Sequence, residues 1–264
     1  GHYGDWITDE SGLPAYHYTC DHLTDPLAEY RTRRGKSRDH FHLLGNYHVS
    51  ALAHNEGYVE FFRPDSLGCW LNRYAPRRDA YAGGFGFLRV DGNVRSTLYQ
   101  HLGSPLYRRI WGVGYFRKSA AWGDLTVEQV AFIPYGDDPV LVNLTTLGNR
   151  GLRPLTLSYV EYWDVLVTPV LPGRGEQARI LSGARVRRTT RYCAQQRLLL
   201  CSPAGTYPGP GATSGRRDPD PPTIFLAAID GLPVAGYETS RALFFGAGGL
   251  DGPEALQLPF LACN

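Results

Sequence analysis

The chain has 264 residues, a length that suits one large β domain, and 12% of its residues are aromatic. Its 27 basic and 25 acidic residues nearly balance, which gives no indication of a nucleic-acid or anionic-membrane partner. No segment approaches the roughly 20 apolar residues that cross a bilayer, and five cysteines without metal-like spacing favour a reducing compartment, so we expect a cytoplasmic protein that is not bound to a membrane.

The first 40 residues are predicted to form an N-terminal extension that packs on a β-sandwich domain of residues 41–264. Within the extension, residues 23–34 contain a short helix signal, in which Pro26 suits the first helical position. The basic run at 31–38 is interpreted as a solvated surface loop. From residue 41 onward, short apolar runs alternate with turn clusters of Gly, Asn and Asp, which tolerate the positive φ of tight hairpins.

Residues 107–163 give the strongest strand signal. The segment 107–118 is predicted to be one Gly-rich aromatic strand, and residues 127–134 a strand that ends in a proline turn. A third strand leads to the turn Asn149-Arg150-Gly151, and a fourth ends at Glu161-Tyr162-Trp163-Asp164. Strands of this length and spacing predict an antiparallel meander. Both faces of the second strand are partly apolar, so we expect it to be covered on both sides in a two-sheet stack.

The last third of the chain continues this pattern. Residues 179–201 are predicted to form a hairpin with one Arg-rich face. The stretch 202–222 is rich in Gly, Pro and Ser and is predicted to be a long surface loop, after which strands resume at 223–229 and 241–248. The elements together predict an all-β fold, an antiparallel super-β-sandwich with few short helices.

All eight histidines lie in the first 101 residues. Four of them are close together in the sequence: His40, His42, His48 and His54. His40 and His42 would share one face of a strand and, with Asp39 or Glu56, could hold a metal ion. Spacing alone does not define metal geometry, so we interpret the segment as a sheet strand with outward polar residues and predict neither a metal nor another cofactor.

Acid–base chemistry on sugars needs carboxylates that flank the scissile bond. The candidates beside aromatic residues are Glu128, Glu161 and Asp164. Glu161 stands out because it occupies an apolar strand, where a carboxylate must find partners. The simpler interpretation pairs it with an arginine inside the sandwich. We therefore predict no catalytic residue, with Glu161 as the nearest candidate.

Aromatic residues and arginines alternate along residues 107–122. Aromatic faces stack on the C–H surfaces of sugars, and arginine bonds hydroxyl or phosphate oxygens through a rigid fork. The candidate sugar-binding residues are Trp70, Arg73, Trp111, Tyr115, Arg117 and Trp122. The alternative is that these rings belong to the core, because burial of large rings stabilises sheets.

Three segments carry a family resemblance by their order and spacing. They are Trp70–Tyr74 followed by Gly83-Gly84, then Tyr107–Phe116, then Ile133 to Trp163. On the basis of these segments, about residues 40–260 resemble the N-terminal β-sandwich domain of the cellobiose/chitobiose phosphorylase family. That family is glycoside hydrolase family 94-like and was formerly glycosyltransferase family 36. The chain departs from the family where Ile110-Trp111 stands in place of an Arg-His pair.

The resemblance implies a galactose mutarotase-like sandwich that is mainly non-catalytic. The parent enzyme would cleave a β-glucoside with inorganic phosphate as co-substrate in one inverting displacement, giving a sugar 1-phosphate. Its catalytic acid would lie in a helical (α/α)6 domain C-terminal to this chain. The sandwich would shape the sugar site and bury a subunit interface, as expected of a homodimer.

Two other functions remain open. A stand-alone carbohydrate-binding module would use the aromatic residues of the 107–122 segment. A mutarotase-like aldose epimerase would need a histidine, His48 or His101, together with Glu161, and no local motif supports that pairing.

Overall fold

The computed structural model describes residues 3–20, 40–64, 68–99, 106–170, 185–207, 221–229 and 233–258, together with 261 and 263. The predicted helix at 23–34 and the basic run at 31–38 lie outside these residues. Antiparallel strands dominate and the helices are short, which confirms the all-β sandwich class. The chain divides into two compact units, residues 1–63 with 72–165 and residues 64–71 with 166–264, and each is described by itself.

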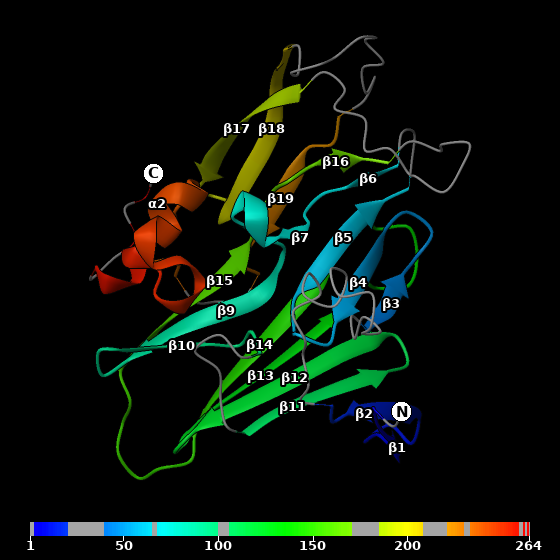
Figure 1. Cartoon of the computed structure of the whole chain (residues 1–264), viewed down its shortest axis with the longest axis vertical. Coiled ribbons are helices and arrows are strands. Elements are labelled where there is room, and N and C mark those ends of the chain that lie inside the picture. Colours follow the sequence, from blue (N-terminus) through cyan, green and yellow to red (C-terminus); the bar gives the residue numbers. More distant parts are fainter. Residues whose placement is uncertain are drawn as a thin grey trace, which may run out of the picture. The chain divides into compact units, whose positions relative to one another are not determined.

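The first unit is built on a six-stranded antiparallel sheet in the order β1-β2-β11-β12-β13-β14 (Figure 1). Its strands are β1 (Gly4–Thr8), β2 (Pro14–Tyr18), β11 (Leu106–Gly112), β12 (Tyr115–Trp122), β13 (Leu125–Phe132) and β14 (Val142–Asn149). Hairpins from β11 to β14 form a meander, and β1 and β2 continue the sheet beside β11. The prediction of a single strand at 107–118 is wrong, because the chain reverses between β11 and β12 at Gly114, whose φ is +80°.

A second sheet of the same unit has the order β10-β9-β15. Its strands are β9 (Gly83–Val90), β10 (Asn93–Ser96) and β15 (Leu157–Trp163). Asp91 and Gly92 turn the β9–β10 hairpin at φ values of +49° and +78°, as their residue types predict. β15 pairs with β9, placing Glu161 opposite Gly86. The prediction that β15 is the fourth strand of the meander is therefore wrong, since its pairing partner lies some 70 residues earlier in the chain and not on β14.

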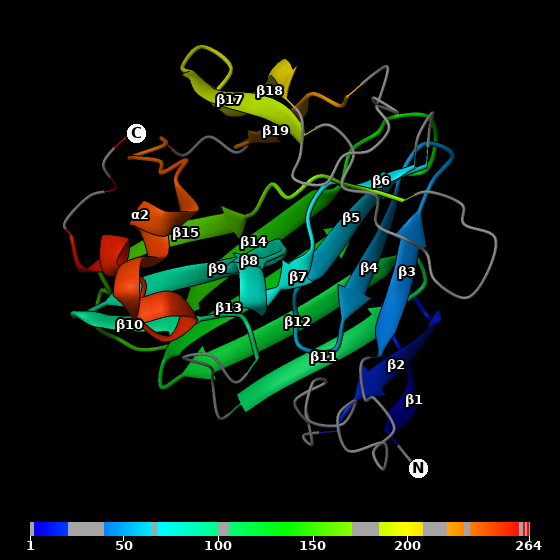
Figure 2. The ribbon, with the colours of Figure 1, turned by 45° about the horizontal axis from the view of Figure 1, so that its top comes forward.

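Three more strands form an antiparallel group in the first unit: β3 (Phe41–Gly45), β4 (Ser50–His54) and β5 (Val59–Arg63). A small ribbon of β7 (Tyr74–Ala75) and β8 (Ala80–Tyr81) encloses the 3-10 turn η1 (Pro76–Arg78). In Figure 2 the β3–β5 group and the β10-β9-β15 sheet both lie over the six-stranded sheet.

The core explains this two-layer arrangement. Phe116 of β12 and Ala131 of β13 pack with Ala51 and Val59, so the β3–β5 group covers one end of the β12–β13 hairpin. Leu125 and Val127 pack with Leu88, so the β9 sheet covers the other end. Burying each large apolar side chain contributes about 1.5–3 kcal/mol, which makes these contacts the main support of the sandwich.

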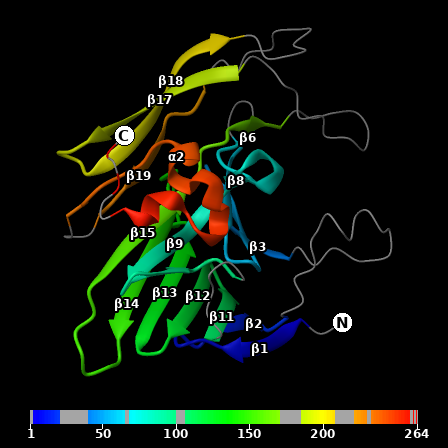
Figure 3. The same ribbon diagram turned by 60° about the vertical axis from the view of Figure 1, so that its left-hand side comes forward.

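The second unit contains a short antiparallel pair, β6 (Cys69–Trp70) with β16 (Thr168–Pro169), and a three-stranded sheet (Figure 3). The sheet consists of β17 (Arg185–Cys193), β18 (Leu198–Tyr207) and β19 (Ile224–Ala227). The predicted hairpin at 179–201 is thus confirmed in its described part. The predicted loop begins too early, because residues 202–207 continue β18 through a bulge that accommodates Pro203 and Gly205.

The segment 241–248 is helical, so the prediction of a strand there is wrong. It forms α2 (Arg241–Phe245) and the start of η2 (Gly246–Asp251), which η3 (Glu254–Gln257) follows. The Ser240 hydroxyl accepts a hydrogen bond from the Leu243 amide at 3.3 Å and caps the helix. α2 has only five residues, and nowhere in the described part of the chain is a helix long and apolar enough to cross a membrane.

Candidate functional site

The Glu161 carboxylate is the centre of a polar network inside the first unit. Its Oε1 accepts hydrogen bonds from the Asn143 amide at 2.7 Å and from the Trp163 indole at 2.8 Å. Its Oε2 accepts from the Tyr159 hydroxyl and from the Gln129 amide, the latter at 3.3 Å. Burial raises the pKa of Glu161, while these donors act in the opposite direction. The prediction of an arginine partner is wrong for the part of the chain that the structure describes, where four neutral donors hold Glu161.

Gln129 extends the network through the sandwich. Its Oε1 accepts from the Thr97 hydroxyl at 2.5 Å, and its amide nitrogen lies 3.1 Å from Thr145 Oγ1 and 2.8 Å from the Tyr159 hydroxyl. Thr97 in turn accepts from the Gly86 amide at 2.8 Å. The network therefore ties β9 and β15 of one sheet to β13 and β14 of the other.

Lys118 is a buried cation that the sequence analysis did not single out. Its ammonium group donates to the carbonyl oxygens of Gly57 and Gly84, at 2.5 and 2.7 Å. Burial lowers the pKa of Lys118 to about 7, and the negative charge of Glu161 opposes this shift. The signal that could have found it is the alternation of β12, in which Phe116 and Ala120 also point inward.

The arrangement around Glu161 favours a structural role over a catalytic one. A general acid must deliver its proton to an oxygen of the substrate. Both oxygens of Glu161 already face protein donors from β13, β14 and β15. Its chemistry is therefore that of an acceptor that satisfies polar groups between two sheets.

Trp111 lies on the inner face of the six-stranded sheet, in a row of rings. It is nearly parallel to Tyr16, at 6.2 Å and 19°, and to His42, at 6.3 Å and 16°. Tyr16 continues the row to Trp6, whose ring it meets edge-on at 5.3 Å. Trp111 also packs against the hydrophobic cluster that contains Phe116, so it contributes to the core.

Tyr115 and Arg117 lie on the opposite face of the sheet from Trp111. The Tyr115 hydroxyl donates to Asp9 at 2.9 Å, and the Arg117 guanidinium binds both carboxylate oxygens of Glu10. This ion pair lowers the pKa of Glu10 to about 2. The structure thus does not bring the predicted aromatic set together, because neighbouring strand residues alternate between faces.

Arg73 belongs to a separate cluster around Glu60, a carboxylate that the sequence analysis missed. Glu60 is buried, accepts from the Tyr74 amide at 2.8 Å and lies 3.2 Å from Arg73 Nε and 3.4 Å from His54 Nε2. The Tyr58 ring stacks between the rings of His54 and Tyr74, at 4.3 and 4.2 Å. Glu60 is the second residue of β5 and lies between apolar residues, the same signal that identified Glu161.

Trp70 is the one candidate that lies in the second unit, on β6.

The four neighbouring histidines have different partners. His40 shares a hydrogen bond with the Tyr18 hydroxyl at 2.9 Å, and His42 donates to the Gly112 carbonyl at 2.9 Å. His48 lies 3.7 Å from Asp137, and His54 belongs to the Glu60 cluster. Among the residues that the structure describes, no group of three or more His, Cys, Asp or Glu side chains could hold a metal ion.

The other two carboxylate candidates are apart from Glu161. Glu128 is exposed on β13, on the sheet face of Arg117. Asp164 accepts from the backbone amides of Tyr81 and Val165, at 3.3 and 2.8 Å, and so fastens the end of β15.

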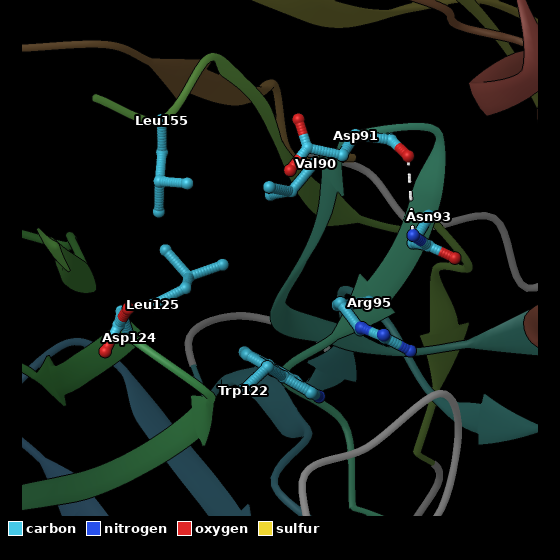
Figure 4. A pocket seen from close by; sticks show the side chains of 8 residues that line it. All are labelled: Val90, Asp91, Asn93, Arg95, Trp122, Asp124, Leu125 and Leu155. Carbon is cyan, nitrogen blue, oxygen red and sulfur yellow. Dashed lines mark hydrogen bonds between the residues drawn. The ribbon is translucent and has the colours of Figure 1, made fainter. Parts of the chain in front are cut away.

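Trp122 lines a pocket of about 220 Å³ at one end of the sandwich (Figure 4). The other lining residues are Val90, Asp91, Asn93, Arg95, Asp124, Leu125 and Leu155. Of the predicted sugar-binding residues, Trp122 is therefore the one that this pocket contains. Its neighbours Asp91, Asn93 and Arg95 were not predicted, because their approach to Trp122 depends on how the two sheets stack.

A family model described as "Glycosyl hydrolase 94, supersandwich domain" matches residues 26–261. A search of the curated proteins finds no match. The matched span begins after β1 and β2 and includes the Glu161 network and the Trp122 pocket.

Proposed function

Because the chain belongs to the glycosyl hydrolase 94 family, whose supersandwich domain spans residues 26–261, we propose that it is the mainly non-catalytic sandwich domain of an inverting glycoside phosphorylase.

In the proposed reaction, inorganic phosphate attacks the anomeric carbon of a β-glucoside from the face opposite the leaving group. The glycosidic C–O bond breaks, and one protein acid protonates the departing oxygen. The products are a sugar 1-phosphate of inverted configuration and a free sugar. Phosphate replaces the base-activated water of an inverting hydrolase, so the protein has to supply only the acid, and the proposal assigns it to a helical (α/α)6 domain C-terminal to the sandwich.

The hydrogen bonding of Glu161 is the observation that supports a non-catalytic role for the sandwich. This carboxylate is the sequence-based candidate for an acid, and its two oxygens accept from Tyr159, Gln129, Asn143 and Trp163. An aldose epimerase would need a histidine that acts together with this carboxylate. Among the described residues the hydrogen bonds of Glu161 come from other residue types, and His48 lies beside Asp137 instead. The other candidate histidine, His101, lies outside the described residues.

In the proposed enzyme the sandwich supports the sugar site through its loops and contributes to the interface of a cytoplasmic homodimer. This role suits an interior in which a continuous polar network and two apolar clusters hold two sheets in fixed register. Loops that emerge from such a scaffold keep their positions when substrate binds.

An immunoblot of the native protein in its source cell, followed by an assay of that protein, tests the proposal. We expect a band several times larger than 29.3 kDa, and release of a sugar 1-phosphate from β-glucosides that requires inorganic phosphate. We expect Glu161→Gln in that native protein to retain most of the activity. A native chain of 29.3 kDa that anomerises free sugars by itself, and loses this activity in Glu161→Gln, would overturn the proposal in favour of an epimerase.

A further inference from the structure

The pocket beside Trp122 is built by turns at one end of the first unit. Val90 ends β9 and Asp91 starts its hairpin turn, while Trp122 ends β12 and Asp124 lies in the β12–β13 turn. The segment between β14 and β15 contributes Leu155. Binding residues are often carried by turns on a rigid scaffold. Here the scaffold beneath the turns is the apolar cluster of Leu88, Leu125 and Val127.

One side of the pocket is apolar and the other is polar. Figure 4 shows Leu125 and Leu155 on one side of an open space and Asn93 and Arg95 on the other. Trp122 lies between these sides and is half-buried, so its ring is fixed by packing yet contributes to the wall. An aromatic face beside aliphatic groups suits the C–H surface of a sugar ring.

The polar side offers hydrogen bonds of both kinds. Arg95 and Asn93 have N–H donors, and the carboxylates of Asp91 and Asp124 are acceptors. Asp91 and Asn93 are exposed and belong to one turn, in which the Asn93 amide donates to the Asp91 carbonyl at 3.4 Å. Sugar hydroxyls donate and accept at the same time, so they can use such a mixed set of groups.

The charge and the size of the pocket restrict the class of ligand that it can bind. Two carboxylates around a single arginine disfavour a phosphate ion, while the arginine disfavours a bare divalent cation, which prefers several oxygen ligands. The volume of about 220 Å³ lies below the ~300–1,000 Å³ of pockets for drug-sized ligands. It therefore suits one ring of an oligosaccharide, with the rest of the chain outside the pocket.

We propose that this pocket is a carbohydrate-binding site that holds one uncharged pyranose ring against Trp122. Binding here would keep a saccharide on the sandwich. Sugar binding in this pocket depends on its own lining residues and not on whether the parent enzyme uses phosphate or water.

An NMR titration of the 264-residue chain tests the proposal. The probes are glucose, galactose and N-acetylglucosamine, each with its β-linked disaccharide, and inorganic phosphate and calcium chloride serve as competing ligand classes. The indole N–H resonance that disappears in Trp122→Phe identifies Trp122. We expect at least one sugar to shift this resonance, together with the amides of the Asp91-Gly92 turn, in a saturable way.

Two variants at the rim separate binding from folding. Asp91→Asn keeps a residue that tolerates the positive φ of 49°, and Arg95→Gln keeps a polar side chain on β10. Each removes one charged hydrogen-bonding group, so we expect each to weaken sugar binding about tenfold. Arg89→Gln is the matched control, because Arg89 lies on the same hairpin but on its opposite face. Arg89 pairs with Val94, whereas Arg95 pairs with Leu88.

Three results would overturn the proposal. They are the absence of a saturable shift with every sugar, equal affinity in the wild type and both rim variants, and a larger response of the same resonances to phosphate or calcium. The titration measures binding without catalysis. A phosphorylase assay that fails would therefore leave this result intact, and a failed titration would leave the proposed reaction intact.

Discussion

Replacing Glu161 with leucine or glutamine tests whether the buried network stabilises the sandwich. Leucine removes both acceptors and the charge at similar volume, whereas glutamine keeps one acceptor and the shape. We expect the leucine variant to be much less stable than the glutamine variant, because an apolar residue leaves the surrounding donors unsatisfied.

The hydrogen bonds give the size of the effect. Two of the four donors have another acceptor, since the Tyr159 hydroxyl and the Gln129 amide both approach Thr145 Oγ1, at 3.2 and 3.1 Å. The Asn143 amide and the Trp163 indole depend on Glu161 Oε1. An unsatisfied buried donor costs about 1–3 kcal/mol, so Glu161→Leu should lower the free energy of unfolding by roughly 2–6 kcal/mol. Glu161→Gln can keep its oxygen towards these two donors and should cost only about 1 kcal/mol.

Urea denaturation followed by tryptophan fluorescence measures the free energy of unfolding of both variants. The slope m shows whether the variants unfold between the same folded and unfolded states as the wild type. Glu128→Leu is the control, because Glu128 is an exposed glutamate on a neighbouring strand, and a surface change of this kind should stay within about 0.5 kcal/mol. Equal stability of Glu161→Leu and the wild type would refute the structural assignment. So would a Glu161→Gln protein of normal stability that had lost all activity in the native enzyme.

Two further predictions concern the charged groups of the same sheet. Lys118→Met should destabilise the sandwich by roughly 2–4 kcal/mol in the same urea experiment, because the carbonyls of Gly57 and Gly84 lose their donor, and an unchanged midpoint would contradict the burial of this lysine. Arg117 lowers the pKa of Glu10 from its ordinary 4.5 to about 2, so the stabilisation from this pair is present above pH 4.5 and is lost as the pH falls towards 2. Glu10→Gln should therefore flatten the decline of the unfolding midpoint between pH 4.5 and 2, and an identical decline in variant and wild type would argue against the pair.

Local patterns were sufficient to predict the class of the fold but not the pairing of its strands. The alternation of residues 127–133 predicts a strand, and the Asp91-Gly92 turn predicts its hairpin. The prediction that this strand is covered on both sides is wrong, because one face of β13 is buried whereas Glu128 on the other face is exposed. The pairing of β15 with β9 instead of β14 depends on contacts between distant segments, which no local pattern encodes. The segment at 241–245 is a short apolar run for which periodicity cannot separate strand from helix, and its cap at Ser240 was the informative signal.

The candidate site shows the same limit at the level of single side chains. Glu161 could be found because a carboxylate in an apolar strand needs partners, but the identity of those partners follows from the stacking of two sheets. Trp111 and Tyr115 are four residues apart and lie on opposite faces, which becomes clear only once the turn at Gly114 is located. Trp122 acquires its neighbours from the β9–β10 hairpin, some 30 residues earlier in the chain.

The polar network around Glu161 and the Trp122 pocket lie at different positions along the same strands, β9 and β13. The stability of the network and binding in the pocket therefore depend on the same strand register. Gly86 and Gln129 each lie four residues from a pocket residue, Val90 and Leu125, which corresponds to about 13 Å along a strand. A one-residue slip of β9 or β13 would turn every side chain of that strand to the other face and take the pocket apart. The hydrogen bonds that join Gly86 to Gln129 through Thr97 oppose such a slip, because a shifted register would leave them unmade in the interior. The buried polar groups thus hold in place a binding surface that they do not themselves touch.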